Sequence, residues 1–222
     1  MCLIVLAWRV RPDYPLIVAA NRDEFHARPA ARAGFWKDQP SILAGRDLEA
    51  GGTWMGVSRS GRFAAVTNYR GGQDANAAES RGALVPRFLL GDLPPGKFVS
   101  SVNPNSFSGF NLLVADRDEL WWLSNRNGAA KKLEPGFHAL GNLLLNTPEV
   151  MDVKSRFEGV GTAIEPHFAL LANAKIVAPE YGTRCATVLL AHADGRMQFA
   201  ERPFDASGAE GSTLRYEFSA SG

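Results

Sequence analysis

Two apolar segments near the N-terminus constrain the fold more than any other feature of the sequence. Residues 2–10 and 15–22 are rich in apolar and β-branched side chains, and turn-forming residues at 11–14 separate them. This pattern predicts an antiparallel hairpin. Because the start of the first strand then lies beside the end of the second, we expect Cys2 to be a neighbour of residues 21–23.

The remainder of the chain alternates between apolar runs and turn signals. Short apolar runs between turn residues predict strands at 42–45, 53–58, 62–69, 109–115, 119–125, 137–141, 184–191 and 197–203, with an edge strand at 216–219. Helical spacing predicts helices at 79–90, 148–164 and 166–174, the second capped by Thr147, and the segments 25–39 and 92–108 are expected to be loops. Gly51 and Gly52 allow a sharp bend or a close backbone approach. Many hairpins with few helices indicate an α+β architecture of stacked antiparallel sheets with helices outside.

Composition limits the classes of function. The 222 residues suit a single domain spanning 1–222, and a net charge of +1 offers no field for nucleic acid or an acidic membrane. The apolar run from Cys2 to Trp8 is too short to span a membrane, and no secretory signal is visible, so a cytoplasmic location with reduced Cys2 and Cys185 is expected. The four histidines lack ligand spacing, which argues against a metal site.

Cys2 is the candidate nucleophile. A methionine followed by a small residue is usually removed, which would leave Cys2 with both a thiol and a free α-amine. An α-amine titrates at about 7.7–8.0 and can act as a base at neutral pH, while the thiolate is a strong nucleophile. The alternative is that Cys2 is a small apolar residue at the start of a buried strand.

Attack on a carbonyl by Cys2 needs groups that orient the α-amine and lower the pKa of the thiol, and donors for the developing oxyanion. Asp23 is a candidate to hold the α-amine and Arg22 to lower the pKa of the thiol, although the two could simply be a solvated ion pair. Asn68 and Asn142, each at a strand end, are candidate oxyanion donors, although asparagine is also common in turns. Arg184 could bind a substrate carboxylate or hold the site together, or it could be a surface arginine of an edge strand.

Several short motifs occur in the order seen in the NRDE family, also called the transport and Golgi organisation 2 family, which the sequence resembles along most of its length. The motifs are Met1-Cys2, Ala19-Ala20-Asn21-Arg22-Asp23-Glu24-Phe25 with Arg28-Pro29, Phe35-Trp36, Ile42-Leu43-Ala44-Gly45-Arg46-Asp47, Gly51-Gly52-Thr53-Trp54-Met55-Gly56, Ala64-Ala65-Val66-Thr67-Asn68-Tyr69, Gly109-Phe110-Asn111-Leu112, Gly141-Asn142, Thr147-Pro148, Tyr181-Gly182-Thr183-Arg184 and Glu201-Arg202.

The resemblance implies an N-terminal nucleophile hydrolase-like fold, a four-layer αββα sandwich of antiparallel sheets. The cholylglycine hydrolase and penicillin V acylase group has this fold and cleaves amides with an N-terminal cysteine. By this resemblance Cys2 is the nucleophile, Asp23 bonds the α-amine, and Arg184 matches a late arginine of that group. Asn68 with Tyr69, and Asn142, resemble its two oxyanion contacts.

One departure from the acylase pattern concerns the arginine. That group has an R-N-x-D arrangement, whereas Ala20 precedes Asn21 here and the arginine is Arg22. Because side chains alternate along a strand, Arg22 is expected on the other face from Asp23. Which positive charge lowers the pKa of the Cys2 thiol is therefore left open.

Two functions follow from these expectations. The first is hydrolysis of an amide or thioester of a small acyl compound without a cofactor, with Asn21 and the aromatic side chains of Phe35, Trp36, Trp54 and Tyr69 contacting the substrate. The second is a non-catalytic binding or trafficking protein for a lipid, acyl-CoA or haem ligand, with His26 as a candidate iron ligand. Retention of Met1 would favour the second, and a homo-oligomer is left open.

Overall fold

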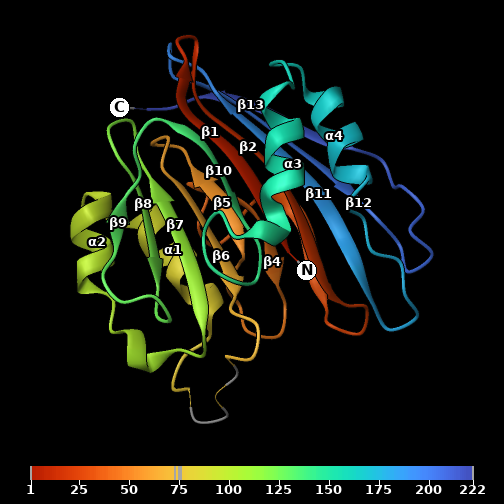
Figure 1. Cartoon of the computed structure of the whole chain (residues 1–222), viewed down its shortest axis with the longest axis horizontal. Coiled ribbons are helices and arrows are strands. Elements are labelled where there is room, and N and C mark those ends of the chain that lie inside the picture. Colours follow the sequence, from red (N-terminus) through yellow and green to blue (C-terminus); the bar gives the residue numbers. More distant parts are fainter. Residues whose placement is uncertain (1, 73, 75–76, 222) are drawn as a thin grey trace. The chain divides into compact units, whose positions relative to one another are not determined.

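The computed structural model describes residues 2–72, 74 and 77–221, so Met1, whose removal is predicted, lies outside the described residues. The chain divides into two compact units (Figure 1). The first unit contains the residues up to Arg28 together with Pro135–Ser219, and the second contains Pro29–Glu134 with the last residues of the chain. A single domain over 1–222 stays a prediction.

The first unit is built on a six-stranded antiparallel sheet with the strand order β10-β1-β2-β11-β12-β13. The predicted hairpin is confirmed as β1 and β2, and β2 also pairs with β11, so the hairpin lies in the middle of the sheet. The strands are β1 (Leu3–Arg11), β2 (Tyr14–Phe25), β10 (Gly136–Leu140), β11 (Tyr181–Ala191), β12 (Arg196–Pro203) and β13 (Leu214–Ser219).

Two helices, α3 (Pro148–Glu158) and α4 (Ile164–Ala172), cover one face of this sheet (Figure 1). Their apolar sides pack on alternate strand residues, with Phe157 and Leu171 meeting Val5, Ala19 and Val188 in one core cluster. The period of two along each strand puts these residues on the same face. The strand residues between them are also apolar and buried, so the middle of the hairpin is covered on both faces.

The second unit is a seven-stranded antiparallel sheet in the order β3-β4-β5-β6-β7-β8-β9. Its strands follow one another in sequence, as expected for consecutive hairpins. They are β3 (Ala30–Phe35), β4 (Ile42–Asp47), β5 (Met55–Ser58), β6 (Phe63–Asn68), β7 (Phe110–Ala115), β8 (Leu120–Ser124) and β9 (Lys131–Lys132). Helices α1 (Leu84–Leu90) and α2 (Pro95–Ser101) pack on one face, where Phe88 and Phe98 join Val66 and Leu112 in a second core cluster.

The predicted close backbone approach at Gly52 is confirmed. A Cβ atom on Gly52 would lie 2.4 Å from the carbonyl oxygen of Gly82, and the Thr53 N–H donates to that same oxygen at 3.1 Å. Only glycine fits at this position, because the contact is between two main chains and neither can rotate away. The contact fixes the start of β5 against the turn that leads into α1.

Several predicted boundaries were wrong. The segment 25–39 contains β3, and the segment 92–108 contains α2, where only loops were expected. The predicted 148–164 helix begins at Pro148 but ends at Glu158, followed by Gly159. Thr147 occupies the N-cap position without making a capping bond, because its hydroxyl donates instead to the Leu144 carbonyl at 3.1 Å.

Each unit supplies one antiparallel sheet and one helix layer, so the predicted α+β class is confirmed. Among the helices of the described residues, none is both long and apolar enough to cross a membrane.

Candidate functional site

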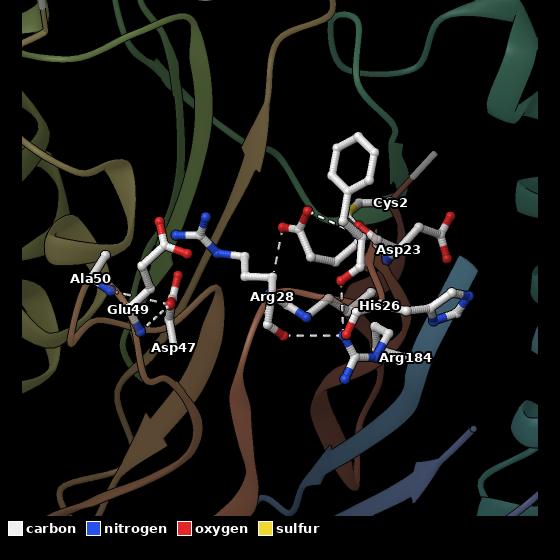
Figure 2. A network of polar contacts seen from close by, with 11 residues as sticks. Cys2, Asp23, His26, Arg28, Asp47, Glu49, Ala50 and Arg184 are labelled. Atoms are coloured by element: carbon white, nitrogen blue, oxygen red, sulfur yellow. Dashed lines mark hydrogen bonds and ion pairs between the residues drawn. The ribbon is translucent and has the colours of Figure 1, made fainter. Parts of the chain in front are cut away.

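Cys2 lies directly before β1, and its sulfur rests against the main chain of Asp23 (Figure 2). Sγ is 3.4 Å from both the N–H nitrogen and the carbonyl oxygen of Asp23. The predicted proximity of Cys2 to the end of β2 is therefore confirmed. Burial, and then the negative charge of Asp23, raise the pKa of the Cys2 thiol to about 11, while the Asp23 N–H and Arg22 oppose the shift. In the chain that still carries Met1, the thiol is thus protonated at neutral pH.

Asp23 is held by a residue that the sequence analysis did not single out by itself. The Thr183 hydroxyl donates to Asp23 Oδ1 at 2.6 Å, and the same hydroxyl oxygen accepts the Ile176 N–H at 2.8 Å. Asp23 is 4% exposed and Thr183 1% exposed. Burial raises the pKa of Asp23, whereas the hydrogen bond from Thr183 lowers it. A hydrophobic-pattern analysis gives no signal for Thr183, which appeared only within a family motif.

Arg22 alternates with Asp23 along β2 and pairs across the sheet with Cys185. Its Nη2 atom lies 3.5 Å from Glu24 Oε2, and its positive charge lowers the pKa of the Cys2 thiol. Because Leu3 pairs with Asn21, one further step of the register sets Cys2 beside Arg22. Cys2 and Cys185 are then two strand spacings apart, about 9.5 Å, which is too far for a disulfide. Both thiols are free.

Asn142 follows β10 and is half-buried. In the β1–β10 pairing Ile4 lies opposite Leu140. The pairing ends there, because the chain turns back directly after β10 and Leu145 forms an antiparallel bridge with Leu140. Asn142 thus lies in the turn after β10 in the first unit, and its role as an oxyanion donor stays a prediction.

Arg184 lies in the middle of the sheet and not on an edge strand, since β11 pairs with both β2 and β12. The pairing of β11 with β2 is irregular between Thr183 and Cys185, where a bulge re-aims the arginine. Its Nη1 donates to the carbonyl oxygens of Phe25, His26 and Arg28 at 2.9, 3.2 and 3.2 Å (Figure 2). These bonds favour the expectation that Arg184 holds the site together.

Asn21 is 1% exposed, and its side chain contacts the helix layer. Its Nδ2 donates to the Leu171 carbonyl in the last turn of α4 at 2.9 Å, while its Oδ1 has no hydrogen-bond partner among the described residues. A substrate contact by Asn21 stays a prediction.

The other predicted oxyanion donor and the predicted pocket aromatics belong to the second unit. Asn68 is the last residue of β6 and is exposed, and Tyr69 and Trp54 are half-buried. The Tyr69 N–H donates to the Gly109 carbonyl at 2.8 Å. The roles of these three residues stay predictions.

Phe35 and Trp36 have structural partners within the second unit. Trp36 is 7% exposed and belongs to the core cluster, its Nε1 donates to the Ala44 carbonyl at 3.2 Å, and the Arg46 guanidinium lies 4.2 Å from the ring centre. The Arg59 guanidinium lies 3.9 Å from the ring centre of Phe35. Each ring thus makes a cation–π contact within the second unit, and a substrate contact by either stays a prediction.

His26 is a poor fit to a haem ligand. Its Nε2 is 3.0 Å from the Ala178 carbonyl oxygen, and a carbonyl only accepts, so Nε2 carries the proton there. Its main-chain N–H donates to the Glu180 carbonyl at 2.8 Å. Iron binding through Nε2 would therefore break a bond that positions the turn after β2. Within the described parts of the chain, no group of three or more His, Cys, Asp and Glu side chains is arranged to hold a metal ion.

Two cavities occur away from these residues. One of about 240 Å³ lies between α1 and α2 in the second unit, and one of about 170 Å³ lies beside β13 in the first. Both are smaller than the roughly 300–1,000 Å³ of typical small-molecule pockets. Neither is lined by a predicted site residue.

A family model described as "Transport and Golgi organisation 2" matches residues 1–165. The chain is 33% identical to the human "Transport and Golgi organization protein 2 homolog" over 272 aligned positions, which cover 98% of this chain and 99% of that protein. The bovine homologue is 34% identical, with 91% and 92% covered.

Among solved structures, the Caenorhabditis elegans N-acylethanolamine-hydrolyzing acid amidase ortholog is similar, with a TM-score of 0.51. The similarity covers 85% of this chain and 92% of that chain at 10% sequence identity. At this identity the similarity shows a common fold, that of the N-terminal nucleophile hydrolases.

Proposed function

Because the chain belongs to the Transport and Golgi organisation 2 family and has an N-terminal nucleophile hydrolase fold, we propose that it is a cysteine hydrolase of acyl compounds. It cleaves an amide or thioester bond of a small acyl molecule, without a cofactor. The observation that carries the proposal is the position of the Cys2 sulfur, 3.4 Å from the main chain of Asp23, whose carboxylate is in turn held by Thr183.

Removal of Met1 starts the mechanism, because it gives Cys2 its own α-amine. The amine takes the thiol proton, and the thiolate attacks the carbonyl carbon of the substrate. Asp23 holds the resulting ammonium. A buried carboxylate is well suited to this task, since the opposite charge relieves the desolvation that raises the pKa of Asp23.

The tetrahedral intermediate carries a negative oxygen that needs donors. Asn142, in the turn directly after the strand β10 that pairs with β1, is the donor proposed from this unit. The role of Asn68 as a second donor rests on the family resemblance alone. The carbon–nitrogen or carbon–sulfur bond then breaks, and the leaving amine or thiol takes the proton from the ammonium.

Water completes the cycle. It adds to the acyl-Cys2 thioester while the α-amine accepts one of its protons, and the acid is released as the Cys2 thiol re-forms. Arg22 supplies the positive charge that the acylase group draws from another position, since its charge lowers the pKa of the thiol. The proposed location is the cytoplasm, where both cysteines would remain reduced.

One observation favours a second candidate, a binding protein without turnover for a lipid or acyl-CoA ligand. With Met1 attached, the pKa of Cys2 is about 11, so such a chain has almost no thiolate at neutral pH. The two candidates therefore differ in whether Met1 is removed and whether the thiol then becomes reactive.

The test measures intact mass and thiol reactivity together. The purified protein is treated briefly with a limiting amount of iodoacetamide between pH 6 and 9, and the adduct is located by peptide mapping. We expect loss of Met1 and fast labelling at Cys2, with the buried Cys185 as the internal reference. Amide and thioester substrates are then screened, with Cys2→Ser as the inactive control.

A matched variant separates the amine from the thiol. One glycine inserted before Cys2 keeps the thiol but moves the free amine to the inserted residue, so labelling should slow at least about tenfold at pH 7. Equal labelling of the two chains, or a native chain that retains Met1, would refute the hydrolase proposal and favour the binding protein.

A further inference from the structure

An aromatic side chain stands exposed at the end of β2. Phe25 is 56% exposed, although a large apolar side chain is ordinarily buried. It pairs in register with Tyr181 at the start of β11, and the two rings meet edge to face with their centres 5.3 Å apart. We call this pair of rings the Phe25–Tyr181 ledge.

The ledge adjoins the candidate nucleophile. Phe25 is two residues beyond Asp23 on the same face of β2, and Tyr181 is two residues before Thr183 on β11. Two residues of a strand span about 7 Å. Asp23 in turn contacts the Cys2 sulfur through its main chain. The ledge thus lies two residues beyond the Asp23–Thr183 pair, and the thiol contacts the main chain of that pair.

The electrostatics of Tyr181 agree with this position. Burial raises the pKa of the Tyr181 hydroxyl, and the negative charges of Cys2 and Asp23 raise it further. The phenol therefore stays neutral throughout the neutral pH range. The ledge presents an uncharged, largely apolar surface beside a charged centre.

We propose that the Phe25–Tyr181 ledge receives the apolar chain of the acyl group that is bonded to Cys2. The site then selects acyl groups with a long apolar chain over acetyl-sized groups. This inference rests on the proposed function and names its substrate class.

The size of the ledge favours an acyl chain over a protein partner. Two aromatic side chains together offer at most about 300–500 Å², and here both are partly covered. A stable protein interface buries about 1,200–2,000 Å². A chain of six to ten carbon atoms matches the available surface, and its first atom would be bonded to the neighbouring thiol.

The test uses alkyl methanethiosulfonates with methyl, butyl and octyl chains. The Cys2 thiolate attacks the sulfur that carries the alkyl chain, a new disulfide bond forms, and methanesulfinate leaves. The chain is thereby attached where an acyl chain would be. Rates at Cys2 are measured by peptide mapping and divided by the rate of glutathione with the same reagent, which removes the intrinsic reactivity of each compound.

We expect the normalised octyl-to-methyl rate ratio at Cys2 to be about tenfold or more, since each buried methylene favours binding. Phe25→Ala should reduce the ratio to about twofold, and Tyr181→Phe should preserve it because the ring remains. Met151→Ala removes another partly exposed apolar side chain, on α3, and should change nothing. Because Phe25 is largely exposed, its substitution leaves the fold intact.

The outcomes separate this inference from the hydrolase proposal. A ratio near one in the native chain, or a ratio that Phe25→Ala does not change, overturns the ledge even if short acyl amides are hydrolysed. A chain-length preference that depends on Phe25 supports the ledge even if no substrate is turned over. In that case the hydrolase proposal fails while the acyl chain remains the ligand.

Discussion

Replacing Thr183 by valine tests the hydrogen bond that holds the candidate catalytic carboxylate. Valine has nearly the same shape as threonine but lacks the hydroxyl. The change removes the 2.6 Å bond donated to Asp23 and the 2.8 Å bond accepted from Ile176, both at a residue that is 1% exposed.

The free-energy cost of losing each of these two hydrogen bonds can be estimated. A hydrogen bond to a charged group contributes about 1.5–3 kcal/mol, and an orphaned buried N–H costs about 1–3 kcal/mol. Since partial relaxation toward water offsets some of this, we expect Thr183→Val to lower the free energy of unfolding by about 3 kcal/mol at pH 7.5. In a chain of this size that corresponds to a fall in Tm of roughly 6–12 °C.

The effect should depend on pH with a defined sign. The pKa of Asp23 is raised by burial, so ionisation of this group lowers stability as the pH rises above its ordinary value of 3.8. The Thr183 hydroxyl opposes that loss by favouring the carboxylate. The penalty of Thr183→Val should therefore be larger at pH 7.5 than at pH 4.

Urea unfolding followed by tryptophan fluorescence measures the change, provided that the transition is two-state. Thr183→Ser keeps the hydroxyl and should recover most of the loss. Thr187→Val, equally buried in the same strand but on the other face, controls for the removal of a hydroxyl as such. A Thr183→Val protein within about 0.5 kcal/mol of the native chain would refute the reasoning.

Three further outcomes are expected. Arg184→Met should speed amide hydrogen exchange in the turn after β2 at least about tenfold, because three carbonyls lose their donor. Unchanged exchange would mean that these bonds do not stabilise the turn. Burial lowers the pKa of His167 below 6.5, so stability is complete above about pH 6.5 and falls as the pH drops below it; His167→Gln should flatten this dependence in urea midpoints at pH 7.5 and 5.5. Gly52→Ala should cost about 3 kcal/mol or more, whereas Gly161→Ala, with no atom within 4 Å of the new methyl, should be neutral; equal Tm values for the two would contradict the contact with Gly82.

Two segments show where the local sequence pattern fails to predict secondary structure. β3 consists of Ala30–Phe35, which has no apolar alternation and is half exposed, and it exists because β4 offers a partner edge. α2 begins at Pro95 and contains Gly96, and this glycine is required because a Cβ there would lie 2.8 Å from the Trp121 ring. In both cases a tertiary contact outweighs weak local preference.

The contacts of the candidate site were likewise only partly predictable from the sequence. The proximity of Cys2 to Asp23 follows from a hairpin whose strands are close in sequence and whose turn is visible, so register alone predicts it. The partner of Asp23 lies 160 residues away, on a strand that could have been expected at a sheet edge.

The sequence by itself therefore determined the hairpin and the family and singled out Cys2 as the proposed nucleophile, because these depend on local apolar runs and on short motifs. Only the tertiary structure decided that β11 pairs with β2, and hence that Thr183 holds Asp23, that Arg184 secures the turn after β2, and that Phe25 meets Tyr181. The physical reason is that pairing between distant strands is selected by the packing of whole faces, which no single segment encodes.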